Sequence, residues 1–350
     1  MSILSITTMR NEGPFVLEWI AYHRLIGVTD FIVFSNDCDD GTDRLLDMLA
    51  AQGILRHIPI QCGPDESVQW HALKYVHAHR LTAGYDWALF SDCDEFPVIH
   101  VGQHKVQDAL AAIPADTDAI ALPWRLFGAS GIVTFDDSPV IQQFVHSAPL
   151  HLPFPIAGCY IKSLFRPEAF QKAGIHRPKH KPNRAAPRWV DGGGVQLPES
   201  FAKNDNQLAL KGPETRRSVI EMNHYSLRSV ESFLVKMGRG LPNRRWRAVD
   251  LSYWVERNFN TQKNPAIMVL LDPLLAEIET LASLSGVAAC HAQSVAWHRD
   301  EISRIRHTES GYRLFVDCIL ASNSYAMPRG MAVPLHQLYQ SMQRVQSEAD

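Results

Sequence analysis

Two acidic side chains, Asp92 and Asp94, follow the apolar run 87–90 and are separated by a single residue. Side chains two positions apart on a strand point to the same face, and a sharp turn after the strand would bring both carboxylates to one ion. A hard divalent cation such as Mg²⁺ is held by one or two protein carboxylates together with phosphate oxygens of a substrate. The pair therefore predicts that Asp92 and Asp94 bind Mn²⁺ or Mg²⁺ and, through it, a diphosphate.

The neighbouring residues indicate whether the pair is functional, because many Asp-x-Asp pairs are merely solvated acids in surface turns. Here an aromatic and apolar run precedes the acids, and Glu95, Phe96 and Pro97 follow them. The pair thus lies at the carboxyl end of the fourth predicted strand. Ligands of open α/β sheets bind beyond the carboxyl ends of the strands, which favours a functional site.

The first hundred residues alternate between short β-rich runs and helical stretches, which is typical of βαβ units and a mainly parallel sheet. Asn11 is placed to cap the first helix, whose first turn holds Pro14. The loop 36–40 should open onto the same crevice as the acidic pair. The predicted strands are 2–8, 31–34, 54–60 and 87–90, and the predicted helices begin near residues 11, 44 and 67.

The second half of the chain shows a weaker pattern. A helix is predicted over 103–112 and a strand over 119–122, and the Pro-, Gly- and His-rich region 123–198 predicts long functional loops. Within it, the basic stretch 176–188 is interpreted as an exposed loop, either solvated or acceptor-binding. Trp124 and Phe127 suit an acceptor platform or the core equally well. Beyond residue 229 the pattern is mainly helical, without internal repeats.

Several short motifs, taken in order, resemble those of the family 2 glycosyltransferases of the GT-A fold. The resemblance covers about residues 3–240, and the combination is more specific than any single motif. The motifs are Thr8-x-Arg10-Asn11-Glu12, Glu18-Trp19-Ile20-x-Tyr22-His23, Phe34-Ser35-Asn36-Asp37 with Asp40, Asp92-x-Asp94-Glu95-Phe96, Trp124-Arg125-x-Phe127-Gly128, Lys162-Ser163-Leu164-x-Arg166-Pro167, and Asn223-His224-Tyr225 with Arg239-Gly240.

The resemblance implies an α/β fold, a GT-A-like Rossmann-type mainly parallel sheet with flanking helices. Residues 1–248 would form this domain, with a nucleotide-binding half, 1–100, and an acceptor half, 101–248, while 249–350 would form a helical C-terminal extension. It implies that a late histidine, His224, completes the metal shell, a role that a neutral imidazole can fill. It also implies a base and ribose pocket lined by Arg10, Asn11, Glu12, Asn36 and Asp37, of which the last two equally suit turn formation.

Charged side chains offer candidates for the remaining steps. Lys236 and Arg239 lie one helical turn apart after His224 and could stabilise a leaving diphosphate, although the same spacing occurs on solvated helix faces. Transfer with inversion needs a carboxylate that takes the proton of the acceptor hydroxyl. Asp191, beside three glycines, is one candidate base and also suits a turn, and Glu199 is the alternative. Retention of configuration stays open.

These observations predict a metal-dependent glycosyltransferase that moves a sugar from a nucleotide sugar, a uridine diphosphate sugar, to a hydroxyl in glycan or polysaccharide synthesis. The acceptor would be a glycan, a lipid-linked glycan or a small glycoside. Three alternatives compete with this function. A haloacid dehalogenase-type phosphatase usually carries its acids after the first strand, and a nucleotidyltransferase would need an early Gly-rich basic loop. The third alternative is a non-catalytic sugar-nucleotide-binding module.

Composition narrows the class of protein further. The 350 residues are 46% hydrophobic and 20% charged, as in an ordinary globular protein, and the net charge of -3 argues against a nucleic-acid binder. Neither a long apolar run nor a leader pattern is evident, so we expect a cytoplasmic protein, with peripheral membrane contact still possible. The six cysteines form no Cys-x-x-Cys pair, so neither a disulfide framework nor a structural zinc site is expected.

Overall fold

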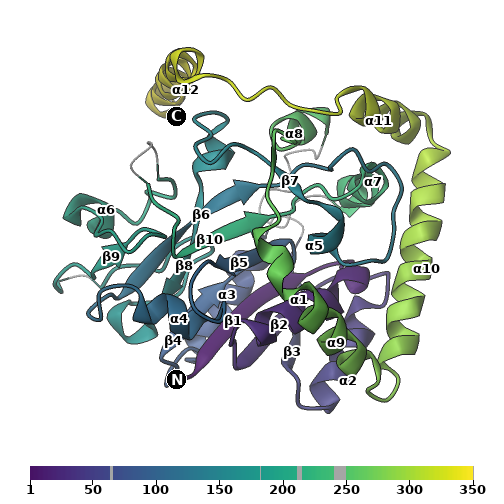
Figure 1. Cartoon of the computed structure of the whole chain (residues 1–350), viewed down its shortest axis with the longest axis horizontal. Helices are drawn as coiled ribbons and strands as arrows, with labels where there is room; N and C mark the ends of the chain where they lie inside the picture. Colours follow the sequence, from purple (N-terminus) through teal and green to yellow (C-terminus); the bar gives the residue numbers. More distant parts are fainter. Residues whose placement is uncertain (64–65, 182, 211–214, 240–249, 350) are drawn as a thin grey trace.

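The computed structural model describes residues 1–63, 66–181, 183–210, 215–239 and 250–349, which form a large sheet covered by helices (Figure 1). The strands are β1 (Ile3–Met9), β2 (Asp30–Ser35), β3 (Arg56–Pro59), β4 (Trp87–Phe90), β5 (Glu95–Ile99), β6 (Ala119–Leu126), β7 (His146–Ser147), β8 (Ile161–Phe165), β9 (Trp189–Val190), β10 (Ile220–His224) and β11 (Gln262–Lys263). The α-helices are α1 (Gly13–Leu25), α2 (Thr42–Ala51), α3 (Val68–Ala78), α4 (Val106–Ala111), α5 (Val140–Gln143), α6 (Glu199–Lys203), α7 (Val230–Arg239), α8 (Leu251–Val255), α9 (Leu271–Ala282), α10 (Val287–Arg306), α11 (Glu309–Leu320) and α12 (Arg329–Ala349). Short 3₁₀ helices are η1 (Ile156–Cys159), η2 (Pro167–Ala169) and η3 (Ala266–Leu270).

The large sheet has the strand order β3-β2-β1-β4-β8-β6-β10-β5, with β9 paired to β6. Strands β3, β2, β1 and β4 are parallel, as the alternation of strands and helices predicts. Strand β8 is antiparallel to both of its neighbours, whereas β10 is parallel to β6 and antiparallel to β5. The predicted α/β class, a mainly parallel sheet with flanking helices and a helical C-terminal region, is confirmed.

Alternating side chains place one hydrophobic core on each face of the sheet. Val33 and Leu89 belong to the core that α1, α2, α9 and the start of α10 cover. Ile32, Phe34 and Phe90 belong to the core that α3 and α6 cover. Because strand side chains alternate between the two faces, nearly every residue of these strands is buried, and the strands read as apolar runs.

The sequence predicts the first four strands and the C-terminal helices, but not all of the strands between them. Strand β4 has the predicted bounds, but β5, β8 and β10 were missed. The run that begins at Ala119 does not end at Pro123. It continues to Leu126, because Trp124 N–H bonds the Tyr160 carbonyl at 2.8 Å and so restores the ladder one residue later.

The basic stretch 176–188 is the predicted exposed loop only in part: residues 183–185 are exposed, whereas Arg177 packs inside the protein. Arg177 is almost fully buried, and its guanidinium donates to the carbonyl oxygens of Gln207, Phe201 and Ala202. The same group stacks over the rings of Trp189 and Phe201. Arg177 therefore holds this loop against the sheet.

The helices after residue 250 pack on the α/β body rather than apart from it. Helix α10 contacts α1, α2 and α7, and a third core joins α7, α8, α10 and α11 around Phe233 and Trp254. In Figure 1, α10 runs along the right side of the molecule, α11 lies near its upper end, and α12 lies at the upper left. None of the helices in the described ranges combines the length and apolarity needed to cross a bilayer.

Helix α1 buries one histidine, His23, completely between aromatic rings. Its ring lies 4.2 Å from that of Trp19, and Nδ1 lies 2.8 Å from the Trp19 carbonyl oxygen. Burial lowers the pKa of His23 to about 4, because the charged imidazolium would be desolvated. The unfolded chain takes up this proton near pH 6.5, so it binds more protons than the native state between these two values.

The free energy of unfolding should therefore fall as the pH drops from about 6.5 toward about 4, by up to about 3 kcal/mol from this group alone. His23→Gln removes the titration while keeping a polar side chain of similar size. Urea unfolding at several pH values should show a shallower acid loss in the variant than in the parent. Parallel pH profiles would contradict this role of His23.

Candidate functional site

The carboxyl ends of three parallel strands meet at one edge of the sheet. In the register, Met9 of β1 lies opposite Ser35 of β2, and Ile6 lies opposite Phe90 at the end of β4. The segments that follow these strands carry Arg10, Asn36 and Asp92. The predicted candidates for nucleotide and metal binding are thus brought to one edge, as the βαβ interpretation expected.

Asp92 is held by two side chains from other elements. Its Oδ1 accepts a 2.6 Å hydrogen bond from Gln69 Nε2, and its Oδ2 lies 3.2 Å from Lys162 Nζ. The Asp92 side chain keeps 30% of its surface exposed, whereas Lys162 is fully buried. The same ammonium lies 3.2 Å from Glu95 Oε2, which also accepts the Asp92 N–H. Asp92 is therefore fixed in orientation while one side of it still faces solvent.

The sequence motifs included Lys162 without giving it a function. Burial opposes its charge, but Asp92 and Glu95 together raise the pKa of Lys162 above its usual value. A buried ammonium between two carboxylates offsets the repulsion that adjacent acids would otherwise suffer. The signal in the sequence was a lone lysine in the apolar run Ile161–Phe165, which a buried strand would not carry without a partner.

Asp94 meets the histidine that the resemblance selected. Strand β10 pairs with β5 so that His224 lies opposite Glu95, and Tyr225 N–H bonds the Asp94 carbonyl at 2.8 Å. His224 Nε2 consequently lies 3.5 Å from Asp94 Oδ1. Lys236 Nζ donates to Asp94 Oδ2 at 2.8 Å and to the Ser226 carbonyl at 2.7 Å.

Neighbouring charges keep Asp94 ionised, and burial keeps His224 neutral. Burial favours the neutral acid, yet Lys236 and His224 lower the pKa of Asp94 well below its usual value. Burial also lowers the pKa of His224, against the pull of Asp94. A carboxylate and a neutral imidazole are the protonation states that a metal ligand requires.

The predicted set of three metal ligands is only partly assembled. Asp94 and His224 lie together, but Asp92 does not form with them a group of three ligand atoms all within 4.8 Å of one another. Gln69 and Lys162 hold its carboxylate instead. Asp94 and His224 still fit a divalent cation, since such ions need few protein ligands when phosphate oxygens supply the rest. His224 Nδ1 is buried without a hydrogen-bond partner, and Lys236 occupies Asp94 Oδ2.

The residues assigned to the nucleotide differ in what they can still contact. Arg10 donates to the Asp37 carbonyl at 3.2 Å, and Asp37 is exposed. Asn36 is mostly buried and donates to Asp37 Oδ2. Asn11 exchanges hydrogen bonds with Asp39 and does not cap α1, whose N-cap is Glu12. Arg10 and Asp37 therefore remain best placed for a ligand at this edge.

Glu12 is the clearest exception among the expected pocket residues. Its Oε2 lies 2.9 Å from Arg228 Nη1, and both side chains are about 8% exposed. The Arg228 guanidinium also covers the Phe15 ring and donates to the Cys93 carbonyl. Glu12 thus forms a buried ion pair that connects the start of α1 to the chain after β10. Removing Glu12 would leave the buried charge of Arg228 uncompensated.

Neither candidate base is placed for proton transfer near Asp94. Asp191 is buried, and its carboxylate accepts hydrogen bonds from the N–H groups of Gly193, Val195 and Arg216. The adjoining Gly192 bonds Ile220, four residues before His224, which corresponds to about 13 Å along the strand. Asp191 therefore builds a turn, the second of its two predicted functions, and Glu199 pairs with Lys203 on the exposed face of α6.

The remaining candidates divide in the same way. Lys236 lies at the site, whereas the side chain of Arg239 falls outside the described residues. Trp124 packs 4.1 Å from the His224 ring, and Phe127 is buried against Tyr225. Of the two interpretations of these aromatic residues, the structure favours the core.

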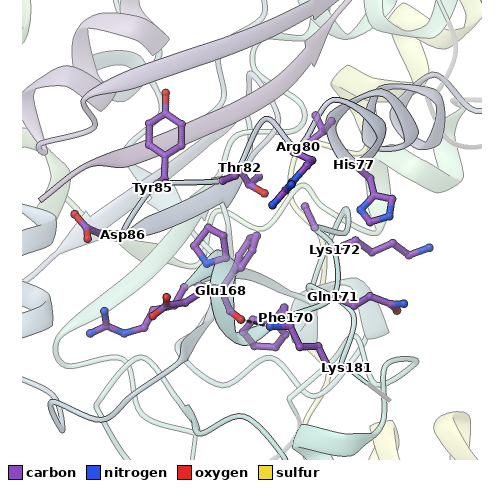
Figure 2. A pocket seen from close by; sticks show the side chains of 17 residues that line it. His77, Arg80, Thr82, Tyr85, Asp86, Glu168, Phe170, Gln171, Lys172 and Lys181 are labelled. Carbon is purple, nitrogen blue, oxygen red and sulfur yellow. Dashed lines mark hydrogen bonds between the residues drawn. The ribbon is translucent and has the colours of Figure 1, made fainter. Parts of the chain in front are cut away.

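A cavity of about 460 Å³ lies at the other end of β4. Figure 2 shows His77, Lys172 and Lys181 on one wall and Tyr85 and Asp86 on the opposite one. Asp86 precedes β4 and Asp92 follows it, a separation of about 20 Å along an extended chain. This cavity therefore cannot present an acceptor to a sugar held at Asp94.

The comparisons with known proteins point to one family. The family model described as "Glycosyltransferase family 92" matches residues 2–203, which include Asp92 and Asp94 but end before His224 and Lys236. A glycosyltransferase family 92 protein of Oryza sativa subsp. japonica is 30% identical over 202 residues, covering 56% of this chain and 32% of the relative. A family 92 protein of Ricinus communis is 32% identical over 131 residues, covering 36% and 23%. The chain thus spans about a third or less of these relatives.

Solved structures give fainter likenesses. A mannosyltransferase of Pyrobaculum calidifontis, in complex with GDP-Man and Mn²⁺, is 12% identical with a TM-score of 0.30, covering 91% of this chain and 85% of that one. S. aureus TarS is 12% identical with a TM-score of 0.32, covering 92% and 89%. Scores this low carry no inference about the site.

The buried lysine gives a prediction about stability. Lys162→Met should lower the free energy of unfolding by about 3–5 kcal/mol, because it leaves Asp92 and Glu95 without their shared counter-charge. Adding Glu95→Gln should recover part of the loss. Urea unfolding measures both, and Lys203→Met on the surface serves as the control. A Lys162→Met protein as stable as the parent would show that the ammonium does not neutralise these acids.

The turn that Asp191 builds gives a second prediction about stability. Asp191→Ala leaves three backbone N–H groups without their acceptor, so the free energy of unfolding should fall by about 2–4 kcal/mol. Glu199→Ala, which removes only an exposed pair, should change it by less than about 1 kcal/mol. Equal losses in the two variants would contradict the turn-building function of Asp191.

Proposed function

The chain belongs to glycosyltransferase family 92, and from that premise we propose that it transfers a sugar from a nucleotide sugar to a hydroxyl group. The observation that carries the proposal is the group of Asp94, His224 and Lys236 at the carboxyl edge of the sheet. Family 2, to which the motifs bear a resemblance, is replaced by family 92, and the two agree at the level of a glycosyltransferase. Membership in a glycosyltransferase family also counts against the phosphatase and nucleotidyltransferase alternatives.

In this proposal the donor lies across the ends of β1, β2 and β4. Arg10 and Asp37 lie where the base and ribose would bind, and Lys236 faces the position of the diphosphate. A uridine diphosphate sugar remains the proposed donor. A cation this close to a departing diphosphate stabilises the charge that develops on it.

Asp94 and His224 would hold Mn²⁺ or Mg²⁺. When bound, the ion would neutralise charge on the diphosphate. Lys236 donates to Asp94 Oδ2, and its charge keeps that carboxylate ionised. When the ion binds, Lys236 can either remain beside it or turn to a phosphate oxygen. Lys162 and Gln69 keep Asp92 turned toward the same edge, where its exposed side can contact the sugar or the diphosphate.

The proposed chemistry is direct displacement with inversion. The acceptor hydroxyl oxygen bonds to the anomeric carbon, the bond from that carbon to the diphosphate oxygen breaks, and the hydroxyl proton passes to a base. This base is left unassigned, because Asp191 accepts backbone N–H groups in a turn and Glu199 pairs with Lys203 on an exposed face. The acceptor is proposed to be a glycan, a lipid-linked glycan or a small glycoside in cytoplasmic glycan or polysaccharide synthesis. Residues 1–248 would form the transferase domain and 249–350 its helical extension.

Slow hydrolysis of a panel of nucleotide sugars, with Mn²⁺, Mg²⁺ or a chelator, tests the proposal. One donor should be turned over in a metal-dependent way. Asp94→Asn should lower that turnover by at least about 100-fold, because it removes the charge that Lys236 and the cation share. Asp300→Asn, on the exposed face of α10, is the matched control. Donor binding without hydrolysis under any condition would favour a non-catalytic sugar-nucleotide-binding module, and failure to bind any donor would contradict the proposal.

The histidine has a test of its own. His224→Asn keeps a polar side chain beside Trp124 but removes the imidazole, so donor affinity should depend less on added Mn²⁺. Titrations of Mn²⁺ against donor binding, monitored by calorimetry, give the comparison. Curves that overlay those of the parent, with the fold intact by circular dichroism, would make His224 structural.

A further inference from the structure

Three metal-ligating side chains gather where β3 leads into α3. The Cys62 Sγ, a Glu66 carboxylate oxygen and a His71 ring nitrogen all lie within 4.8 Å of one another. His71 Nδ1 lies 3.6 Å from Glu66 Oε2. Glu66 and His71 keep 54% and 38% of their side-chain surface exposed, and Cys62 is partly exposed, so an ion can reach all three.

The chemistry of the group suits a thiophilic divalent cation. Zn²⁺ is bound by thiolate sulfur, imidazole nitrogen and carboxylate oxygen, and sites with three protein ligands take water in the fourth position. Nitrogen and oxygen ligands about 2.1 Å from a tetrahedral Zn²⁺ lie about 3.4 Å apart. The 3.6 Å separation of His71 and Glu66 is close to that value. Cys62 Sγ needs to approach by no more than about 1 Å to complete the set.

We propose that Cys62, Glu66 and His71 form a binding site for Zn²⁺, separate from the site at Asp94. The sequence did not suggest it, because the expectation of a zinc site was tested only against Cys-x-x-Cys pairs. Here a cysteine, a glutamate and a histidine are spaced by four and five residues, and only the turn into α3 brings them together.

The position of the site gives the cation a structural effect. Gly63 N–H donates to Glu66 Oε2 at 3.2 Å, and Ser67 caps α3 by accepting the Trp70 N–H. Gln69, in the first turn of α3, then donates to Asp92 Oδ1. A cation bound by Glu66 and His71 ties the approach to α3 to its first turn, and so fixes the helix start that delivers Gln69. Any effect on turnover rests on the proposed function, but the binding of the cation does not.

Cobalt gives a direct readout, because Co²⁺ bound to a thiolate absorbs in the near ultraviolet through sulfur-to-metal charge transfer. The metal-free full chain should develop this band with one equivalent of Co²⁺ and lose it when Zn²⁺ is added. Cys62→Ser should abolish the band, and His71→Ala should weaken Co²⁺ binding at least about 10-fold. Cys38→Ser, which removes another partly exposed thiol, should leave it unchanged.

Absence of the band in the parent, or an equal band in Cys62→Ser, would overturn the proposal. Should Cys62→Ser fail to fold, Glu66→Gln changes only an exposed side chain and should weaken Co²⁺ binding at the same site. Asp94→Asn should retain the band, since no thiol belongs to the Asp94 group. Failure of the zinc site and failure of the proposed transfer reaction are therefore distinguishable.

Discussion

The site depends on the neutralisation of three acids that follow one strand. Asp92, Asp94 and Glu95 would repel one another at the end of β4, in surroundings that are largely dry. Two lysines from distant parts of the chain offset this repulsion. Lys162 comes from β8, 70 residues away from Asp92, and Lys236 comes from α7, 142 residues away from Asp94. Lys236 holds the pKa of Asp94 well below its usual value, whereas burial raises the pKa of Glu95 to about 8 even beside Lys162.

That requirement explains the mixed half of the sheet. Strand β8 runs antiparallel between β4 and β6, and this position brings Lys162 beneath the acids. Strand β10 pairs with β5, and this pairing brings His224 of β10 to Asp94. The chain then leads from β10 into α7, which carries Lys236. The buried pair of Glu12 and Arg228 joins the two halves at the same edge. Removing one member of such a pair costs more than the pair contributes, so these contacts fix the geometry of the site.

The sequence predicted the parallel half of the sheet because its strands are apolar runs separated by helical stretches. It predicted the meeting of Asp94 and His224 only through a resemblance of motifs, since 129 intervening residues hide that contact from local patterns. Strands β5 and β8 were missed because Glu95 and Lys162 interrupt their apolar patterns, and these two charged groups are partners in the structure. Strand β6 was predicted too short because Pro123 interrupts it, and its ladder resumes at Trp124. The sequence leaves Asp191 open between a base and a turn, because a glycine-flanked acid looks alike in both.

The most direct measurement is an experimental structure of the chain with Mn²⁺ and the nucleoside diphosphate of the donor that it hydrolyses. The ion should lie between Asp94 and His224, with a diphosphate oxygen beside Lys236 and the ribose near Asp37. A nucleotide bound elsewhere, or an ion that avoids Asp94 while Lys236 keeps its contact, would contradict the proposed function of this edge.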